Sequence, residues 1–126
     1  MLTMLWPLTA AEAYLKEADG LLEKGKVGEA SEKYYEAAVD AIKILAIKHK
    51  ARAVEEAEAK GDWDLKTIYE AVGELSRIYG ERIMLDWSAS VGLVTADLSG
   101  DIVKDIAEYV RDLVDTSSRG LTSTLA

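Results

Sequence analysis

Residues 9–45 read TAAEAYLKEADGLLEKGKVGEASEKYYEAAVDAIKIL, and they predict two antiparallel helices joined by a glycine-bearing turn. Alanine and leucine recur at helical spacing on both sides of the turn. Thr9 and Glu12 have the spacing of a capping box, which begins a helix, and Gly25 can take the left-handed conformation that ends one. The stretch therefore indicates an all-α fold.

The second of these helices begins near Val27 and poses a question of length. Neither proline nor glycine interrupts the chain from there to Gly61, yet the apolar stripe changes face after Leu45. Two interpretations fit this pattern. The helix breaks near Lys48, or it continues as a rod of about 46 Å whose far half meets a different partner.

Three further helices are expected. The first follows Asp62 or Asp64 and ends at Gly80, the second spans residues 81–96, and the last begins after Asp97 or Ser99. The segment 81–96 is apolar on two sides, which is typical of a buried helix and places it at the bundle centre or at a dimer seam. The last helix has one clean apolar face that should dock on the bundle, comprising Ile102, Val103, Ile106, Tyr109, Val110, Leu113 and Val114.

The expected architecture is an antiparallel up-and-down bundle of about five helices in a single domain, residues 1–126. Residues 1–8 (MLTMLWPL) are expected to form an apolar N-terminal arm. Residues 116–126 are small, polar and interrupted by glycine, so we expect a frayed tail there.

Composition narrows the classes of function. The net charge of −8 disfavours binding to DNA or to anionic lipid, because a polyanion would be repelled. No stretch is long and apolar enough for a membrane span, which favours a cytoplasmic location. Cysteine is absent, so disulfides and thiol chemistry are excluded. Asparagine and glutamine are also absent and charged residues make up 30%, a pattern typical of thermophiles.

The chain has one basic cluster that suggests a ligand site. Lys48, His49 and Arg52 lie close together, and His49 and Arg52 are three positions apart on the stripe of the second helix. In that geometry they would contact a phosphate or carboxylate jointly. The alternative is a solvated helix face balanced by nearby glutamates. No catalytic residue, metal-ligand pattern or cofactor motif is predicted.

Homodimer formation is expected from the apolar surface that one copy leaves uncovered. Trp6 in the N-terminal arm, the far half of the second helix and the segment 81–96 are the candidate regions. The candidate contact residues are Trp6, Ile47, Val54, Trp87, Ala89 and Leu93.

The first hairpin, the isolated tryptophan in LDWSAS (Trp87) and the final amphipathic helix together resemble the PaREP-type archaeal proteins. These look similar to the wider HEPN (higher eukaryote and prokaryote nucleotide-binding) group of helical bundles. The resemblance implies a bundle that commonly forms homodimers. It also implies that some relatives are ribonucleases or partners of minimal nucleotidyltransferases.

The chain departs from the HEPN ribonuclease signature, which needs an arginine followed four to six residues later by a histidine. His49 precedes Arg52 and follows no arginine. We therefore expect a non-catalytic interaction or ligand-binding module that acts as a homodimer. The alternative is an HEPN-type nucleotide-binding protein or RNA-directed enzyme with a degenerate site. In that case a nucleotidyltransferase-like protein is the expected partner.

Overall fold

The computed structural model describes the backbone of residues 6–125 and the side chains of residues 10–119. This part of the chain contains six helices and no strand, so the all-α prediction is confirmed and the expected count of five is wrong. The helices are α1 (Trp6–Glu23), α2 (Val27–Lys48), α3 (Arg52–Lys60), α4 (Leu65–Tyr79), α5 (Glu81–Thr95) and α6 (Gly100–Leu125). None of these described helices is both long and apolar enough to cross a membrane.

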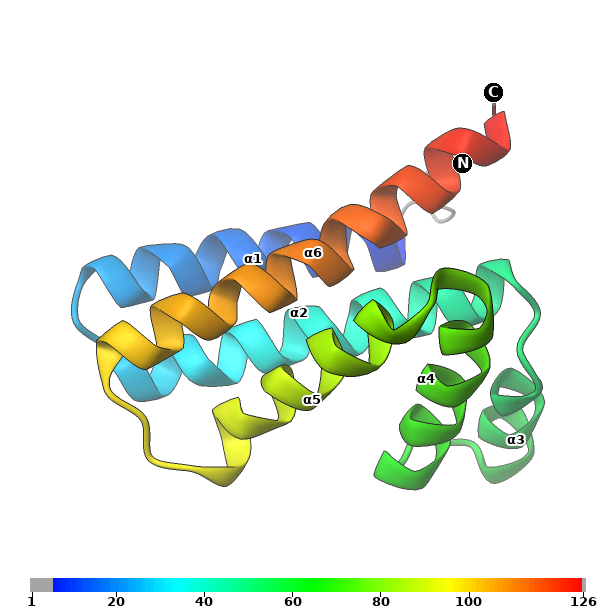
Figure 1. The fold of residues 1–126 in the computed structure, drawn as a ribbon, viewed down its shortest axis with the longest axis horizontal. Helices are drawn as coiled ribbons and strands as arrows, with labels where there is room; N and C mark the ends of the chain where they lie inside the picture. Colours follow the sequence, from blue (N-terminus) through cyan, green and yellow to red (C-terminus); the bar gives the residue numbers. More distant parts are fainter. Residues whose placement is uncertain (1–5, 126) are drawn as a thin grey trace.

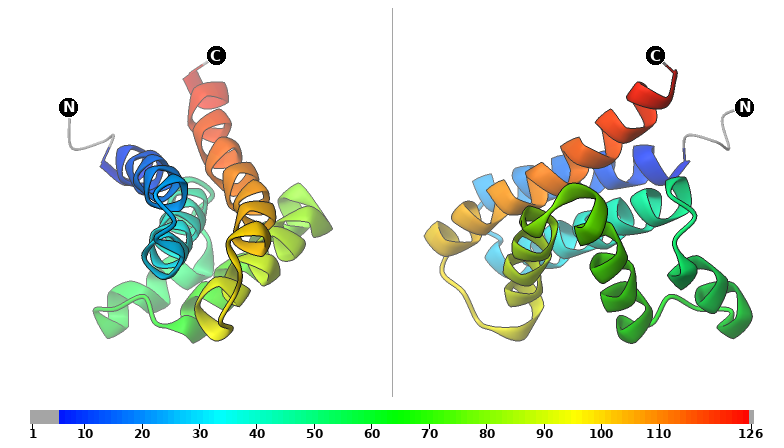
Figure 2. Two further views of the ribbon diagram at one scale, coloured as in Figure 1. Left: turned by 90° about the vertical axis from the view of Figure 1, so that its left-hand side faces the viewer. Right: turned by 45° about the vertical axis from the view of Figure 1, so that its right-hand side comes forward.

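Helix α2 is the centre of the molecule. It contacts every other helix, whereas α1 and α5 lie on opposite sides of it without touching in the described residues. Figure 1 shows α1, α2, α5 and α6 along the long axis, with α1 antiparallel to α2 and α5 antiparallel to α6. Helices α3 and α4 instead run across that axis at one end (Figure 2). The up-and-down arrangement therefore holds for four helices, and α2 takes the central place expected for segment 81–96.

The α1–α2 turn forms as predicted at Gly25, but α1 begins earlier than expected. Gly25 has a φ of 78°, the Gly25 N–H donates to Leu22 O at 3.0 Å and the Lys26 N–H donates to Leu21 O at 2.9 Å. This pattern closes a helix by satisfying its last carbonyls. Because α1 starts at Trp6, Thr9 lies inside the helix, and the predicted capping box at its start is wrong.

The chain breaks after Lys48, so the continuous-rod interpretation is wrong. The Lys50 N–H donates to Ile47 O at 3.2 Å and the Ala51 N–H donates to Ala46 O at 2.9 Å, the same closing pattern as at Gly25. Here a lysine occupies the left-handed position, with a φ of 54° for Lys50. That conformation costs a non-glycine residue about 1–2 kcal/mol. Lysine is therefore not a residue type from which the end of a helix is predicted, and the sequence carries no local signal for the break.

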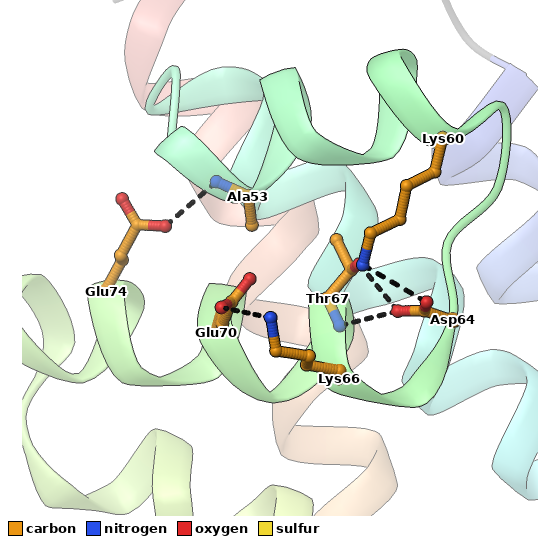
Figure 3. Close-up of polar contacts among 7 residues, drawn as sticks. All are labelled: Ala53, Lys60, Asp64, Lys66, Thr67, Glu70 and Glu74. Carbon is orange, nitrogen blue, oxygen red and sulfur yellow. Dashed lines mark hydrogen bonds and ion pairs between the residues drawn. The ribbon is translucent and has the colours of Figure 1, made fainter.

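The α3–α4 hairpin is fastened at both ends by carboxylates (Figure 3). At its turn, Asp64 is the N-cap of α4, as expected for one of the two aspartates, and accepts from the Thr67 N–H at 2.9 Å. Hydrogen bonds from Thr67 and Lys60 lower the pKa of Asp64 to about 2. At the other end, Glu74 of α4 accepts from the Arg52 and Ala53 N–H groups at 2.8 and 3.0 Å. This carboxylate supplies the N-terminal cap that α3 lacks locally.

Burial within one chain differs from the sequence prediction for α5 and α6. Ile83, Trp87 and Leu93 of α5 are buried, but its opposite side is exposed, so one copy does not cover both faces. On α6, Ile102 and Tyr109 are exposed although the rest of the expected apolar face packs inward. The expected tail boundary at residue 116 is also wrong, because α6 continues to Leu125 and both Thr116 and Ser117 are buried.

Candidate functional site

The structure separates the three residues of the predicted ligand site. Lys48 ends α2, His49 is its C-cap, and Arg52 begins α3 beyond the break. His49 and Arg52 therefore do not share a stripe of one continuous helix, and the geometry predicted for their joint contact with an anion is wrong. Whether any of the three binds a ligand stays a prediction.

His49 is instead paired with Tyr79 at the end of α4. The His49 Nε2 and Tyr79 Oη atoms are 2.8 Å apart, and the two rings meet edge to face with centroids 5.4 Å apart. Burial and the nearby Lys48 charge lower the pKa of His49. The imidazole is thus neutral near pH 7 and packs as part of the α2–α4 contact. The Tyr79 ring also lies beneath Arg82, whose guanidinium carbon is 5.8 Å from the ring centroid.

Arg82 connects this pair to two carboxyl groups at the contact between α5 and α6. Its Nη1 lies 2.7 Å from Asp112 Oδ2 and 3.0 Å from Thr116 Oγ1 on α6. The Asp86 Oδ2 atom of α5 is farther, at 4.0 Å from the same nitrogen. Asp86 is buried, and burial together with the neighbouring Asp112 raises its pKa to about 8. The same partnership lowers the pKa of Asp112, so the pair holds one proton near neutral pH.

A second polar cluster joins α1, α2 and α6. Arg111 of α6 donates from Nη1 and Nη2 to both carboxylate oxygens of Asp19 at 3.0 and 3.1 Å, and the buried Tyr34 hydroxyl donates to Asp19 at 2.5 Å. Burial opposes ionisation of Asp19, yet the bonds from Arg111 and Tyr34 outweigh it and lower the pKa. The cluster borders an open groove of about 500 Å³ that Lys104 and Glu108 also line. The charged groups of this cluster are paired with each other. We therefore interpret the cluster as a structural contact that holds α1, α2 and α6 together.

Arg52 lines a different groove, between α3 and α4. This space of about 440 Å³ is bordered by Arg52, Glu55, Glu56, Glu70, Glu74 and Arg77. Figure 3 shows Glu74 at the N-terminus of α3, while Glu70 is paired with Lys66 at 3.5 Å. Acidic groups outnumber basic ones here, so the groove does not suit the phosphate or carboxylate ligand that the sequence suggested. Within the described residues no group of three or more His, Asp or Glu side chains could hold a metal ion.

The predicted dimer contacts differ in how exposed they are in one copy. Trp87 and Leu93 are buried in the core of one protomer, so the prediction that they contact a second subunit is wrong. Ala89 and Val54 are partly buried and Ile47 is exposed. The Trp6 side chain lies outside the described side chains. The clusters at Asp86–Asp112 and Asp19–Arg111 were not predicted, because each joins residues distant in the sequence.

These features define an all-α protein in which one central helix is wrapped by five others and polar clusters tie the helices together. The model of the Archaeal PaREP1/PaREP8 family matches residues 7–114, and the chain belongs to this family.

Solved structures agree with this assignment. The chain is similar to the crystal structure of a protein from Sulfolobus solfataricus, with 32% identity, a TM-score of 0.83 and coverage of 89% of this chain and 96% of that one. A solution structure of the same structural-genomics target gives 32% identity, a TM-score of 0.77 and coverage of 89% and 91%. No curated protein is significantly similar to the chain in sequence.

Proposed function

We propose that the protein is a non-catalytic interaction module that acts as a homodimer through the outer edge of the α5–α6 pair. The observation that carries the proposal is the exposure of large apolar side chains on these two helices, three of which lie along the edge where α5 and α6 meet. Leu85 is 61% exposed, Ile102 48% and Tyr109 45%. We call these three residues, with the partly buried Ala89 between them, the α5–α6 rim.

The antiparallel register of α5 and α6 places the rim residues on one side of the molecule. Arg82 at the start of α5 bonds Asp112 and Thr116 on α6, while a Cβ atom at Gly92 would lie 3.9 Å from Ile106 Cδ1. Interpolating between these contacts brings Ala89 opposite Tyr109. Ile102 and Tyr109 are seven positions apart and share a face of α6. Among the described residues, helix α1 contacts α6 but not α5. Its bonds to α6 go to Arg111, which lies on the opposite side of that helix from Ile102, so α1 does not cover the rim.

A second copy is the occupant that fits this rim. An isologous contact uses the same patch twice, so it needs no complementary surface elsewhere on the chain. Arg82 and Asp112 on the flank of the rim neutralise each other, whereas the exposed Asp105 lies one turn from both Ile102 and Tyr109 and adds a negative charge at the α6 edge. Burial of the apolar rim side chains has to outweigh this charge and the repulsion between two chains of net charge −8, which salt screens.

Light scattering after size exclusion tests the proposal. The wild type is expected at about twice the 13.8 kDa chain mass. Leu85→Glu should raise the dimer dissociation constant roughly 100-fold or more, because each protomer loses the burial of one leucine, about 1.5–3 kcal/mol, and gains a charge at the contact. Leu65→Glu is the matched control, since Leu65 is similarly exposed but lies on α4. A monomeric wild type at every concentration would refute the proposal.

The HEPN-type enzyme or nucleotidyltransferase partner remains the second proposal, and it ranks lower because of His49. Any histidine-dependent cleavage of RNA would have to use His49, whose Nε2 atom is already paired with Tyr79. We expect the wild type and His49→Ala to show the same background ribonuclease activity. A wild-type activity that disappears in His49→Ala would favour the enzyme instead.

A further inference from the structure

Directly behind the α5–α6 rim lies the carboxyl pair Asp86 and Asp112. Asp86 follows Leu85 in α5, and Asp112 lies one turn after Tyr109 in α6. Only 5% of Asp86 is exposed, and among the described residues its Oδ2 atom has no hydrogen-bond donor. The Asp112 side chain is 39% exposed and so still reaches water at the edge of the rim.

One guanidinium serves these two carboxyl groups. Arg82 bonds Asp112 at 2.7 Å and Thr116 at 3.0 Å, which leaves Asp86 at 4.0 Å, beyond hydrogen-bond distance. A buried carboxylate without a donor is costly, whereas a protonated carboxyl group can donate to its neighbour. The set of Arg82, Asp112 and a protonated Asp86 has no net charge. Loss of the proton leaves a charge of −1 behind the rim.

Among residues 10–119, whose side chains the structure describes, no second cation acts on Asp86. The charged groups that act on it are Asp112 of α6 and Arg82 of α5. From α4, Tyr79 places its ring against Arg82, and from α2, the neutral His49 bonds the Tyr79 hydroxyl. Arg119 of α6 acts on Asp112. Both cations act on Asp112, so the proton is what removes the charge from Asp86.

We propose that the α5–α6 dimer is linked to protonation: each protomer holds one proton on the Asp86–Asp112 pair when assembled, and loss of that proton drives the copies apart. This inference rests on the dimer proposed above. A second copy on Leu85 and Tyr109 would exclude water from the exposed side of Asp112, so the dimer would pay more than the monomer for the extra charge. In an isologous contact the two protomers contribute equivalent carboxyl pairs, so up to two protons per dimer are linked to assembly.

The sign of the pH dependence follows from this difference. Burial and the neighbouring Asp112 raise the pKa of Asp86 to about 8 in a single protomer, and the dimer would raise it further. Below about pH 8 both states hold the proton, so the dissociation constant is flat. Above it, dissociation releases up to two protons per dimer, and the dissociation constant rises up to roughly 100-fold per pH unit.

Sedimentation equilibrium of the full chain at pH 6.5, 7.5, 8.5 and 9.5 and constant ionic strength tests the inference. For the wild type we expect a flat dissociation constant up to about pH 7.5 and at least a tenfold rise by pH 9.5. Asp86→Asn replaces the protonated carboxyl by a neutral group of the same shape, so its dissociation constant should stay flat across the series. Asp62→Asn removes an exposed carboxylate between α3 and α4, away from the rim, and should keep the wild-type profile.

The outcomes separate this inference from the dimer itself. A wild-type dimer with a flat profile, or an Asp86→Asn variant with the wild-type rise, overturns the proton linkage and leaves the dimer standing. A wild type that is monomeric at every pH overturns both. Circular dichroism at each pH shows that a change in mass is not unfolding.

Discussion

Replacing Trp87 by alanine is expected to lower the free energy of unfolding by about 3–5 kcal/mol, the range typical of large aromatic truncations in a core. Trp87 heads the set of large, fully buried side chains, and its ring lies 5.7 Å from Tyr35 of α2 and 6.0 Å from Tyr69 of α4, centroid to centroid. Its removal leaves a cavity where three helices meet. The melting temperature should fall by roughly 10–20 °C for a domain of this size.

Tyr69→Ala is the control for Trp87→Ala. Tyr69 touches the same indole ring from outside but is itself exposed, so its truncation should cost only about 1 kcal/mol. Thermal unfolding followed by circular dichroism measures both variants. Equal losses for the two would mean that Trp87 is not the packing centre of the α2–α4–α5 contact.

The parts of the fold that the sequence predicts are those closed by local chemistry. Gly25 ends α1 and Asp64 begins α4, and both positions carry residue types selected by the turn or cap they form. The break after Lys48 has no such signal. Its left-handed residue is Lys50, and the N-terminus of α3 is capped by Glu74, which is 22 residues from Arg52. The contact with Glu74 of α4 offsets the conformational cost of Lys50. The apolar periodicity of residues 27–61 carries no information about that contact.

The burial of apolar side chains on α5 and α6 could be predicted only in part. The apolar residues of segment 81–96 lie on two sides of the helix, and that pattern does not distinguish burial by the same chain from burial by another. The structure covers the Trp87 side and leaves Leu85 exposed. In the same way, Ile102 and Tyr109 continue the apolar period of α6 but face outward. The apolar periodicity of α5 and α6 identifies the apolar side chains, but it does not show which of them the same chain buries.

The carboxyl pair was missed because its partners are on different helices, although one signal was present in the sequence. Asp86 lies at helical spacing from Ile83 and Ser90, and all three are buried on the same face of α5. An acidic residue on a buried stripe requires either a partner or a proton. The partner, Asp112, could not be named without the register of α5 against α6, which only the folded chain provides.

The alanine positions of α2 allow a second large effect to be predicted. Ala37→Leu is expected to lower the free energy of unfolding by about 1–3 kcal/mol, the usual cost of extra methylenes in a filled core. Ala37 is fully buried one turn after Lys33, which contacts Glu17 at 3.9 Å and the Tyr14 ring at 5.3 Å, so this face of α2 meets α1. Ala11 and Ala18 of α1 are also fully buried. A leucine at position 37 would have to push the two helices apart.

The size of that effect is best read from urea unfolding, since a shift in midpoint at constant slope reports stability alone. Ala13→Leu is the matched control because it adds the same atoms to α1 at an exposed position. Its stability should stay within about 0.5 kcal/mol of wild type. If Ala37→Leu were as stable as Ala13→Leu, the α1–α2 contact would accommodate a leucine at position 37. Close packing of the two helices would then not require alanine there.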